Sequence, residues 1–259
     1  MTMPSEHQVL AKWGEIGKLA EKLVARSSTP DGFSIRPSSA LAGDDRHSSP
    51  FQVSHAVKTS ITSAVDHLHA LCALVLRAQV LHIAAPATLA RGALECAATA
   101  VWIASPASRD ERLTRTLQWQ VKNIKDGDQA ATSAGIAVPT PLEDRLDKVK
   151  NVAAVRRLQY VPTIKKGYTS TEAVKAAEMY LPWQLGVLLP WRLASGFAHG
   201  RSWAMLSYGN VVQTSPTADP TVQNLVVEND LGRALFLGLA AAHTVKGAVE
   251  VYEQRGSAP

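Results

Sequence analysis

The sequence predicts an all-α protein: a bundle of six to eight helices with a small irregular or β-hairpin insertion before the last helix. Three observations predict this class. Apolar residues recur at three- and four-residue spacings along much of the chain, which is typical of amphipathic helices. Three helix-start signals, each a Ser or Thr followed three residues later by Glu, begin at Ser108, Thr140 and Thr169. Strand-like composition appears around 203–228, beside a loop rich in Ser and Pro.

The first third of the chain predicts three helices separated by one long connection. Residues 8–26 have helical apolar spacing, and 28–53 is rich in Ser, Pro, Gly and Asp, which predicts a long loop. A long helix is expected over 54–83. Pro86 suits the first turn of the next helix, which continues to about residue 104 and has mostly small side chains, so a neighbouring helix can approach closely.

The start signals predict the middle helices over 108–135, 140–158 and 169–180, the second with Pro141 at its first helical position.

The last third contains an interrupted helix, the insertion and a final helix. Residues 183–199 have helical spacing, but Pro190 predicts a kink or a new helix start, and Gly200 is a plausible stop. The insertion follows at 203–228. Asn229 or Asp230 then caps a helix that runs to about residue 254.

Composition predicts one soluble domain over 1–259. Apolar residues make up 46% and charged residues 19%, which is typical of a globular chain. The formal net charge is +5 without a block of Lys and Arg, so a polyanionic partner is permitted and not required. We expect a cytoplasmic protein without a membrane partner, because neither a secretory signal nor an uninterrupted apolar span is present. Cys72 and Cys96 lie in apolar runs and are expected to be buried thiols.

The candidate catalytic residues lie in the segment 191–200. Arg192 and His199 are seven positions apart, or about two helical turns, and Ser195 lies between them on the same face. A fixed cation, a hydroxyl and a titratable imidazole on one stripe can hold and act on a phosphate. The same residues also have a structural explanation, in which His199 caps the end of its helix or is a satisfied core residue and Arg192 pairs with Glu95.

Arg91 and Glu95 are the candidate supporting residues. They interrupt an otherwise apolar helix at i, i+4 spacing and therefore share a face. Buried charges need partners, so we expect either a structural ion pair or a pair that orients catalytic groups.

A basic ridge is the candidate nucleic-acid contact. Arg109, Arg112 and Arg115 recur at i, i+3, and Lys122 extends the series. The ridge is either a solvated face or a track for a phosphate backbone.

The Arg-x6-His pattern of Arg192 and His199, late in an all-α chain, resembles the HEPN superfamily, and the Arg91/Glu95 pair is similar to a polar pair in some HEPN-like families. The resemblance implies a metal-independent ribonuclease of stress or phage defence, RNA as partner, and a homodimer that joins two such helices in one cleft. Active members commonly carry Asn, Asp or His after the motif Arg, where this chain has Leu193.

Two other function classes stay open. One is a helical binding or sensing protein without catalysis, whose Arg/Glu/His cluster binds a small anion or organises the core. The other is an enzyme of specialised metabolism with a buried acid–base pocket. No cofactor is expected, and no metal, since His-Glu-x-x-His, Glu-x-x-His and Cys-x-x-Cys patterns are missing from the sequence.

Overall fold

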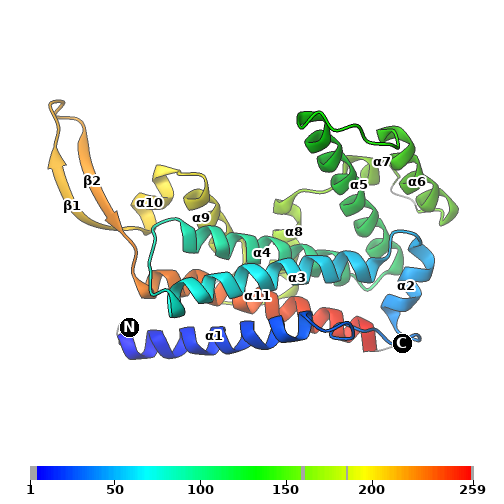
Figure 1. The fold of residues 1–259 in the computed structure, drawn as a ribbon, viewed down its shortest axis with the longest axis horizontal. Helices are drawn as coiled ribbons and strands as arrows, with labels where there is room; N and C mark the ends of the chain where they lie inside the picture. Colours follow the sequence, from blue (N-terminus) through cyan, green and yellow to red (C-terminus); the bar gives the residue numbers. More distant parts are fainter. Residues whose placement is uncertain (1–4, 159–160, 185, 258–259) are drawn as a thin grey trace.

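The computed structural model describes residues 5–158, 161–184 and 186–257. These residues form an all-α fold with a two-stranded hairpin before the last helix, so the predicted class is confirmed. Four long helices lie side by side and form the body of the molecule (Figure 1). They are α1 (Glu6–Ser27), α3 (Val53–Cys72), α4 (Ala85–Ala104) and α11 (Leu231–Ser257).

Helix α4 is the centre of this body and contacts α3, α11, α8 and α9. Its inner faces are built mainly from alanine, and the side chains of Ala90, Ala93, Ala97 and Ala100 are completely buried. Small side chains allow the backbones of neighbouring helices to approach closely, which explains how one helix contacts several others.

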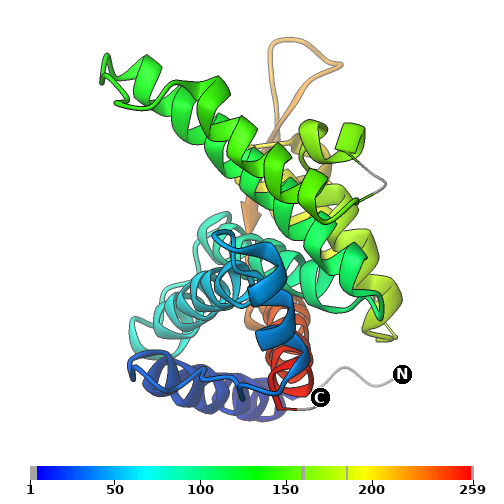
Figure 2. The ribbon, with the colours of Figure 1, turned by 90° about the vertical axis from the view of Figure 1, so that its right-hand side faces the viewer.

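Further helices lie on the side of α4 that faces away from α1 (Figure 2). Helices α8 (Ser170–Tyr180) and α9 (Leu188–Ala198) pack directly on α4. Helices α5 (Arg109–Ser133), α6 (Leu142–Val155) and α7 (Val161–Lys166) pack on one another and lean away from the bundle (Figure 1).

The predicted insertion is a short helix followed by a hairpin. Helix α10 (Ser202–Tyr208) precedes β1 (Asn210–Pro216) and β2 (Gln223–Glu228), which pair antiparallel. The register places Thr214 opposite Leu225, with an irregularity between Val211 and Gln213. The hairpin projects from the body (Figure 1).

The described residues contain eleven α-helices, which is more than the predicted six to eight. Three short helices account for the difference: α2 (Ala40–Ser48), α7 and α10. Helix α2 lies inside 28–53, so the prediction of a long loop there was wrong. Ser39 caps α2 by accepting the Ala42 N–H, and the helix is held by charged contacts from α5 that apolar periodicity does not reveal.

Other helix boundaries were also predicted imperfectly. Helix α3 ends at Cys72 and continues as a π-helical segment, Ala73–Arg77, instead of reaching residue 83. Gln79 then adopts φ +55°, a left-handed conformation that ends the helix.

The three predicted helix starts differ in their outcome. Thr169 and Glu172 form the expected capping box, and Ser108 accepts the Glu111 N–H. At the start of α6, however, Pro141 is the N-cap and no side chain caps the helix, so the predicted Thr140 box was wrong.

Two segments are long and apolar enough to cross a membrane by length and composition, Val53–Arg77 and Leu231–Ser257. In this structure both belong to the helical body, and 72% of the most apolar window of α11 is buried inside it. Core helices of globular bundles have this composition because they are apolar on most sides.

Candidate functional site

Helix α9 carries the candidate catalytic stripe. Pro190 lies in its first turn, where the missing N–H would have no intrahelical partner, so the alternative of a new helix start is the one the structure adopts. Beyond Ala198, Gly200 adopts φ +60° and its N–H donates to Phe197 O, while Arg201 N–H donates to Gly196 O. This Schellman-type end makes His199 the C-cap residue.

Arg192 and His199 are both exposed, and Ser195 between them is half-buried. Neither the Arg192 nor the His199 side chain forms a hydrogen bond or an ion pair with any residue that the structure describes. The predicted stripe is therefore on the surface, and its two end groups are free to contact a ligand.

The supporting pair, Arg91 and Glu95, forms an ion pair of 3.1 Å between Nη2 and Oε2. The Arg91 side chain is 30% exposed and that of Glu95 is 27% exposed, so both are half-buried. Arg91 Nε also donates to Ser195 Oγ over 2.9 Å. The pair on α4 is thereby joined to the middle of the stripe on α9.

Glu95 receives two further hydrogen bonds that sequence reasoning missed. Ser170 Oγ donates to one carboxylate oxygen over 2.6 Å, and Trp191 Nε1 donates to the other over 3.1 Å. Hydrogen-bond donors around a half-buried carboxylate offset the loss of its hydration. An acidic residue in an apolar helix indicates that polar partners exist. The sequence does not identify them, because Ser170 and Trp191 are 75 and 96 positions from Glu95.

The buried side of α9 fixes its position. A Cβ placed on Gly196 would lie 2.5 Å from the Ala204 Cβ and 2.8 Å from a ring carbon of Trp203. Glycine is required at this position because α10 packs directly against the helix backbone. The outer face of α9 is consequently the one that presents Arg192 and His199.

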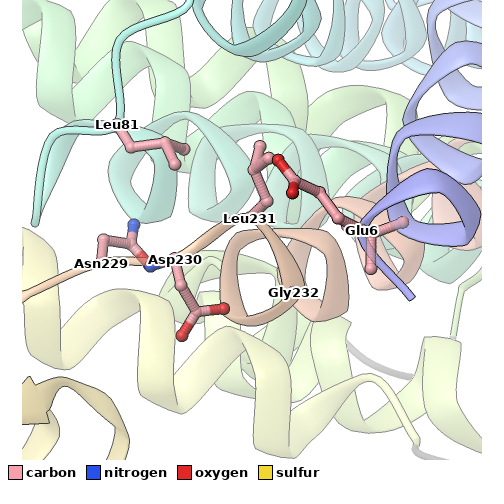
Figure 3. Close-up of a pocket in the computed structure, with 7 residues that line it drawn as sticks. Glu6, Leu81, Asn229, Asp230, Leu231 and Gly232 are labelled. Atoms are coloured by element: carbon pink, nitrogen blue, oxygen red, sulfur yellow. The ribbon is translucent and has the colours of Figure 1, made fainter. Parts of the chain in front are cut away.

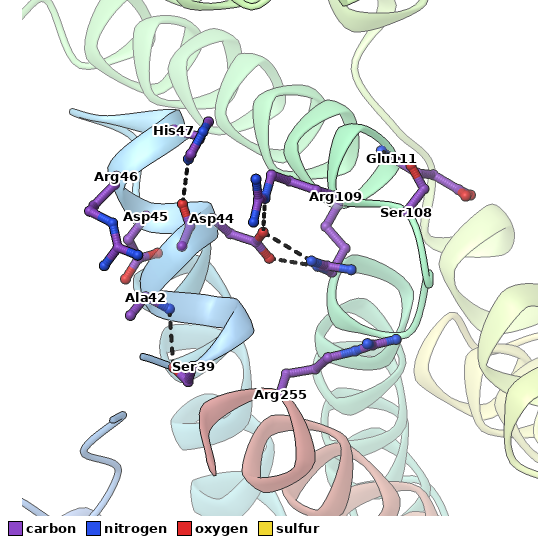
Figure 4. Close-up of polar contacts among 12 residues, drawn as sticks. Ser39, Ala42, Asp44, Asp45, Arg46, His47, Ser108, Arg109, Glu111 and Arg255 are labelled. Carbon is purple, nitrogen blue, oxygen red and sulfur yellow. Dashed lines mark hydrogen bonds and ion pairs between the residues drawn. The ribbon is translucent and has the colours of Figure 1, made fainter. Parts of the chain in front are cut away.

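In the structure, the predicted basic ridge is not a continuous row of free cations. Arg112 is 3% exposed and donates from Nε and Nη2 to the two carboxylate oxygens of the fully buried Asp44, at 2.6 and 2.9 Å. Arg109 contacts the same carboxylate at 3.3 Å (Figure 4). The expectation that Arg112 contacts nucleic acid was therefore wrong, since its guanidinium is buried and paired.

The remaining ridge residues are partly neutralised by acidic neighbours. Arg115 pairs with Glu111 and donates to Trp102 O, and burial lowers the pKa of its guanidinium, an effect that Glu111 partly offsets. Lys122 pairs with Asp126 at 2.7 Å on the solvent side of α5. Three of the four cations, Arg109, Arg115 and Lys122, still reach solvent, but each has a carboxylate partner.

The buried Arg112 has a structural role. Arg112 Nη1 donates to the carbonyl oxygens of Pro106 and Ala107, directly after α4, and Arg255 donates to those of Ala104, Ser105 and Pro106. The last carbonyls of a helix have no intrahelical partner and carry partial negative charge, so cations stabilise this end. The cluster joins α2, α4, α5 and α11 (Figure 4).

The cysteines are not poised as nucleophiles. Cys72 is buried and Cys96 is half-buried. Burial raises the pKa of the Cys72 thiol to about 12 and, with Glu95 nearby, that of Cys96 to about 11. Both thiols are protonated at neutral pH. Among the described residues, no group of three or more His, Cys, Asp and Glu side chains is arranged to hold a metal ion.

A cavity of about 480 Å³ lies where the first turns of α1 and α11 meet (Figure 3). Its lining includes the carboxylates of Glu6 and Asp230 beside Leu81 and Leu231. Acidic groups repel phosphates, so this cavity is a poor candidate for a nucleic-acid site. Comparisons with protein-family models, curated proteins and solved structures give no match for this chain.

Proposed function

We propose that this chain is a HEPN-like endoribonuclease that cleaves RNA without a metal ion, with Arg192 and His199 as the catalytic residues. One observation carries the proposal: both side chains reach solvent from α9, and Arg91 is held beside the same stripe through Ser195. The resemblance further implies a homodimer that acts in stress or phage defence, and we propose that this protein is cytoplasmic.

The spacing within α9 favours a site built by two copies of the chain. Seven residues of helix separate Arg192 from His199 by about 10 Å along the axis. If two α9 helices meet antiparallel about a two-fold axis near Ser195, Arg192 of one protomer lies opposite His199 of its partner.

The residues support a transesterification. The imidazole of His199 takes the proton of a ribose 2′-hydroxyl, and the 2′ oxygen attacks phosphorus. The bond from phosphorus to the 5′ oxygen breaks, and that oxygen receives a proton from the imidazolium. Arg192 and the exposed part of Arg91 stabilise the negative charge on the phosphorane. The products are a 2′,3′-cyclic phosphate and a free 5′-hydroxyl.

A non-catalytic anion-binding protein is the second candidate. The observation that favours it is the closed network around Glu95, which has the form of a structural ion pair. The Leu193 departure favours it as well. The third class, an enzyme with a buried acid–base pocket, is disfavoured because Arg192 and His199 are exposed.

The test is incubation of the purified chain with single-stranded RNA in excess chelator. Matched samples contain His199→Ala, Arg192→Gln, and the control His7→Ala, which removes an exposed imidazole from α1 on the other side of the bundle. We expect cleavage by the wild type and by His7→Ala, a loss of about 100-fold or more for His199→Ala, and no cleavage of the DNA strand of the same sequence. Light scattering gives the oligomeric state.

Cleavage that survives in His199→Ala would remove this residue from the mechanism. RNA binding that weakens in Arg192→Gln, without any cleavage by the wild type, would support the binding protein. If the wild type neither binds nor cleaves RNA, the proposal is overturned.

A further inference from the structure

Helices α2 and α5 meet α3 at one end of the bundle (Figure 1). A groove of about 370 Å³ lies between the segment that begins α3 and the middle of α5. One wall is the turn after α2 together with the first turns of α3, and it contributes Phe51, Gln52 and His55. The other wall is the middle of α5, which contributes Trp119, Gln120 and Asn123. Neither the sequence motifs nor the proposed catalytic stripe includes these residues.

The two aromatic side chains are anchored and still accessible. Phe51 and Trp119 are both half-buried and pack against the hydrophobic core on their inner sides. Core packing restricts their rings, so little rotamer entropy is lost when a flat ligand binds. An aromatic ring of this kind can stack on any nucleobase, because every base has a π-face.

The polar side chains of the groove are unengaged. The side chains of Gln52, His55, Gln120 and Asn123 form no hydrogen bond with any of the described residues. Each amide offers both donors and an acceptor, and a neutral imidazole offers one of each. Such mixed groups match the edges of purine and pyrimidine bases, which carry donors and acceptors side by side.

The groove differs from the other polar depressions of the molecule in its charge. Its lining contains no Asp, Glu, Lys or Arg within the part of the chain that the structure describes. A second groove along α5 is lined by Asp110, Glu111 and Arg115, and a third by Glu143, Lys125 and Lys150. A neutral polar lining with aromatic walls favours an uncharged heteroaromatic group over a phosphate.

We propose that this groove binds an unpaired nucleobase, which stacks on Trp119 and forms hydrogen bonds with Gln120 and Asn123. The assignment of that base to RNA rests on the proposed function.

The test measures binding of AMP, CMP, GMP and UMP by titration calorimetry or saturation-transfer NMR, with ribose 5-phosphate as the base-free probe. Gln120→Ala and Asn123→Ala remove hydrogen bonds, and Trp119→Leu removes the stacking surface. Gln129→Ala is the matched control, because it makes the same change at an exposed position of the same helix. All variants are compared by circular dichroism, and the two polar variants carry the test if Trp119→Leu fails to fold.

We expect at least one mononucleotide to bind and ribose 5-phosphate not to bind. Affinity should fall about 5-fold in Gln120→Ala or Asn123→Ala and at least about 10-fold in Trp119→Leu, and it should be unchanged in Gln129→Ala. Equal binding by all variants, equal binding of ribose 5-phosphate, or no mononucleotide binding would overturn the proposal. None of these measurements uses cleavage, so an inactive protein that binds mononucleotides would refute the proposed function and leave the base site standing.

Discussion

Arg91 on α4 donates a hydrogen bond from Nε to Ser195 Oγ on α9, over 2.9 Å. The two residues are 104 positions apart in the chain. Their contact joins the ion pair with Glu95 to the stripe that ends in Arg192 and His199. A change at Glu95 should therefore affect stability and also the position of the guanidinium beside the stripe.

Replacement of Glu95 by Gln should lower the free energy of unfolding by about 1.5–3 kcal/mol, because Arg91, Ser170 and Trp191 all lose a charged acceptor. Urea unfolding at neutral pH measures the change. Glu15→Gln is the control, since Glu15 pairs with Lys12 in solvent and such pairs contribute about 1 kcal/mol or less. Equal losses in the two variants would contradict a network at Glu95.

Replacement of Asp44 by Asn should be more damaging, at about 3–5 kcal/mol, because the guanidinium of Arg112 stays buried without its counter-charge. Thermal or urea unfolding measures the loss. Asp126→Asn, which breaks the exposed pair with Lys122, should cost about 1 kcal/mol or less. If Asp44→Asn is as mild as that control, the buried pair does not hold α2 against α5.

We expect the free energy of unfolding to depend on pH because of His243. Its ring stacks on Trp183 with centroids 5.2 Å apart, and its Nε2 is buried without a hydrogen-bond partner among the described residues. Burial lowers the pKa of His243 below its usual value of 6.5, Glu250 raises it, and Lys246 lowers it further.

Because the native pKa is lowered, the unfolded chain binds the proton more readily, and stability falls as pH drops below about 6.5. His243→Phe keeps the stacking and removes the titration. Urea unfolding at about pH 8 and pH 5.5 should show a smaller loss of stability in this variant than in the wild type. The exposed His7→Phe should lose as much as the wild type. If His243→Phe loses as much stability between the two pH values as the wild type does, other groups cause the pH dependence.

At the end of the candidate stripe, we expect replacement of Gly200 to lower stability through the backbone conformation. Its φ of +60° disfavours residues with a Cβ, although no atom lies within 4 Å of the position that a Cβ would take. Gly200→Ala should therefore cost about 1–2 kcal/mol through conformation alone. Gly200→Asn should cost less, since Asn tolerates the left-handed region. Thermal unfolding of both variants checks this order, and equal losses would point to a cause other than φ.

The sequence by itself determined the long helices and where several of them begin and end. The Thr169 capping box, Pro190 in a first turn and Gly200 at a helix end are local features, since each acts through backbone groups within about one turn. The side-chain ion pair of Arg91 and Glu95 is also local, because the two residues are one helical turn apart. The helical period places both residues on the same face of α4.

The tertiary structure alone decided which partners these charges find. Helix α2 has no broad apolar stripe and depends on contacts between Asp44 and arginines 65 and 68 positions away. Spacing within α5 predicts a row of arginines but not that one of them is buried against α2. The partners of Glu95 and the two walls of the neutral groove likewise come from separate segments. Helical periodicity describes one helix at a time, whereas pairing between helices depends on how their backbones pack.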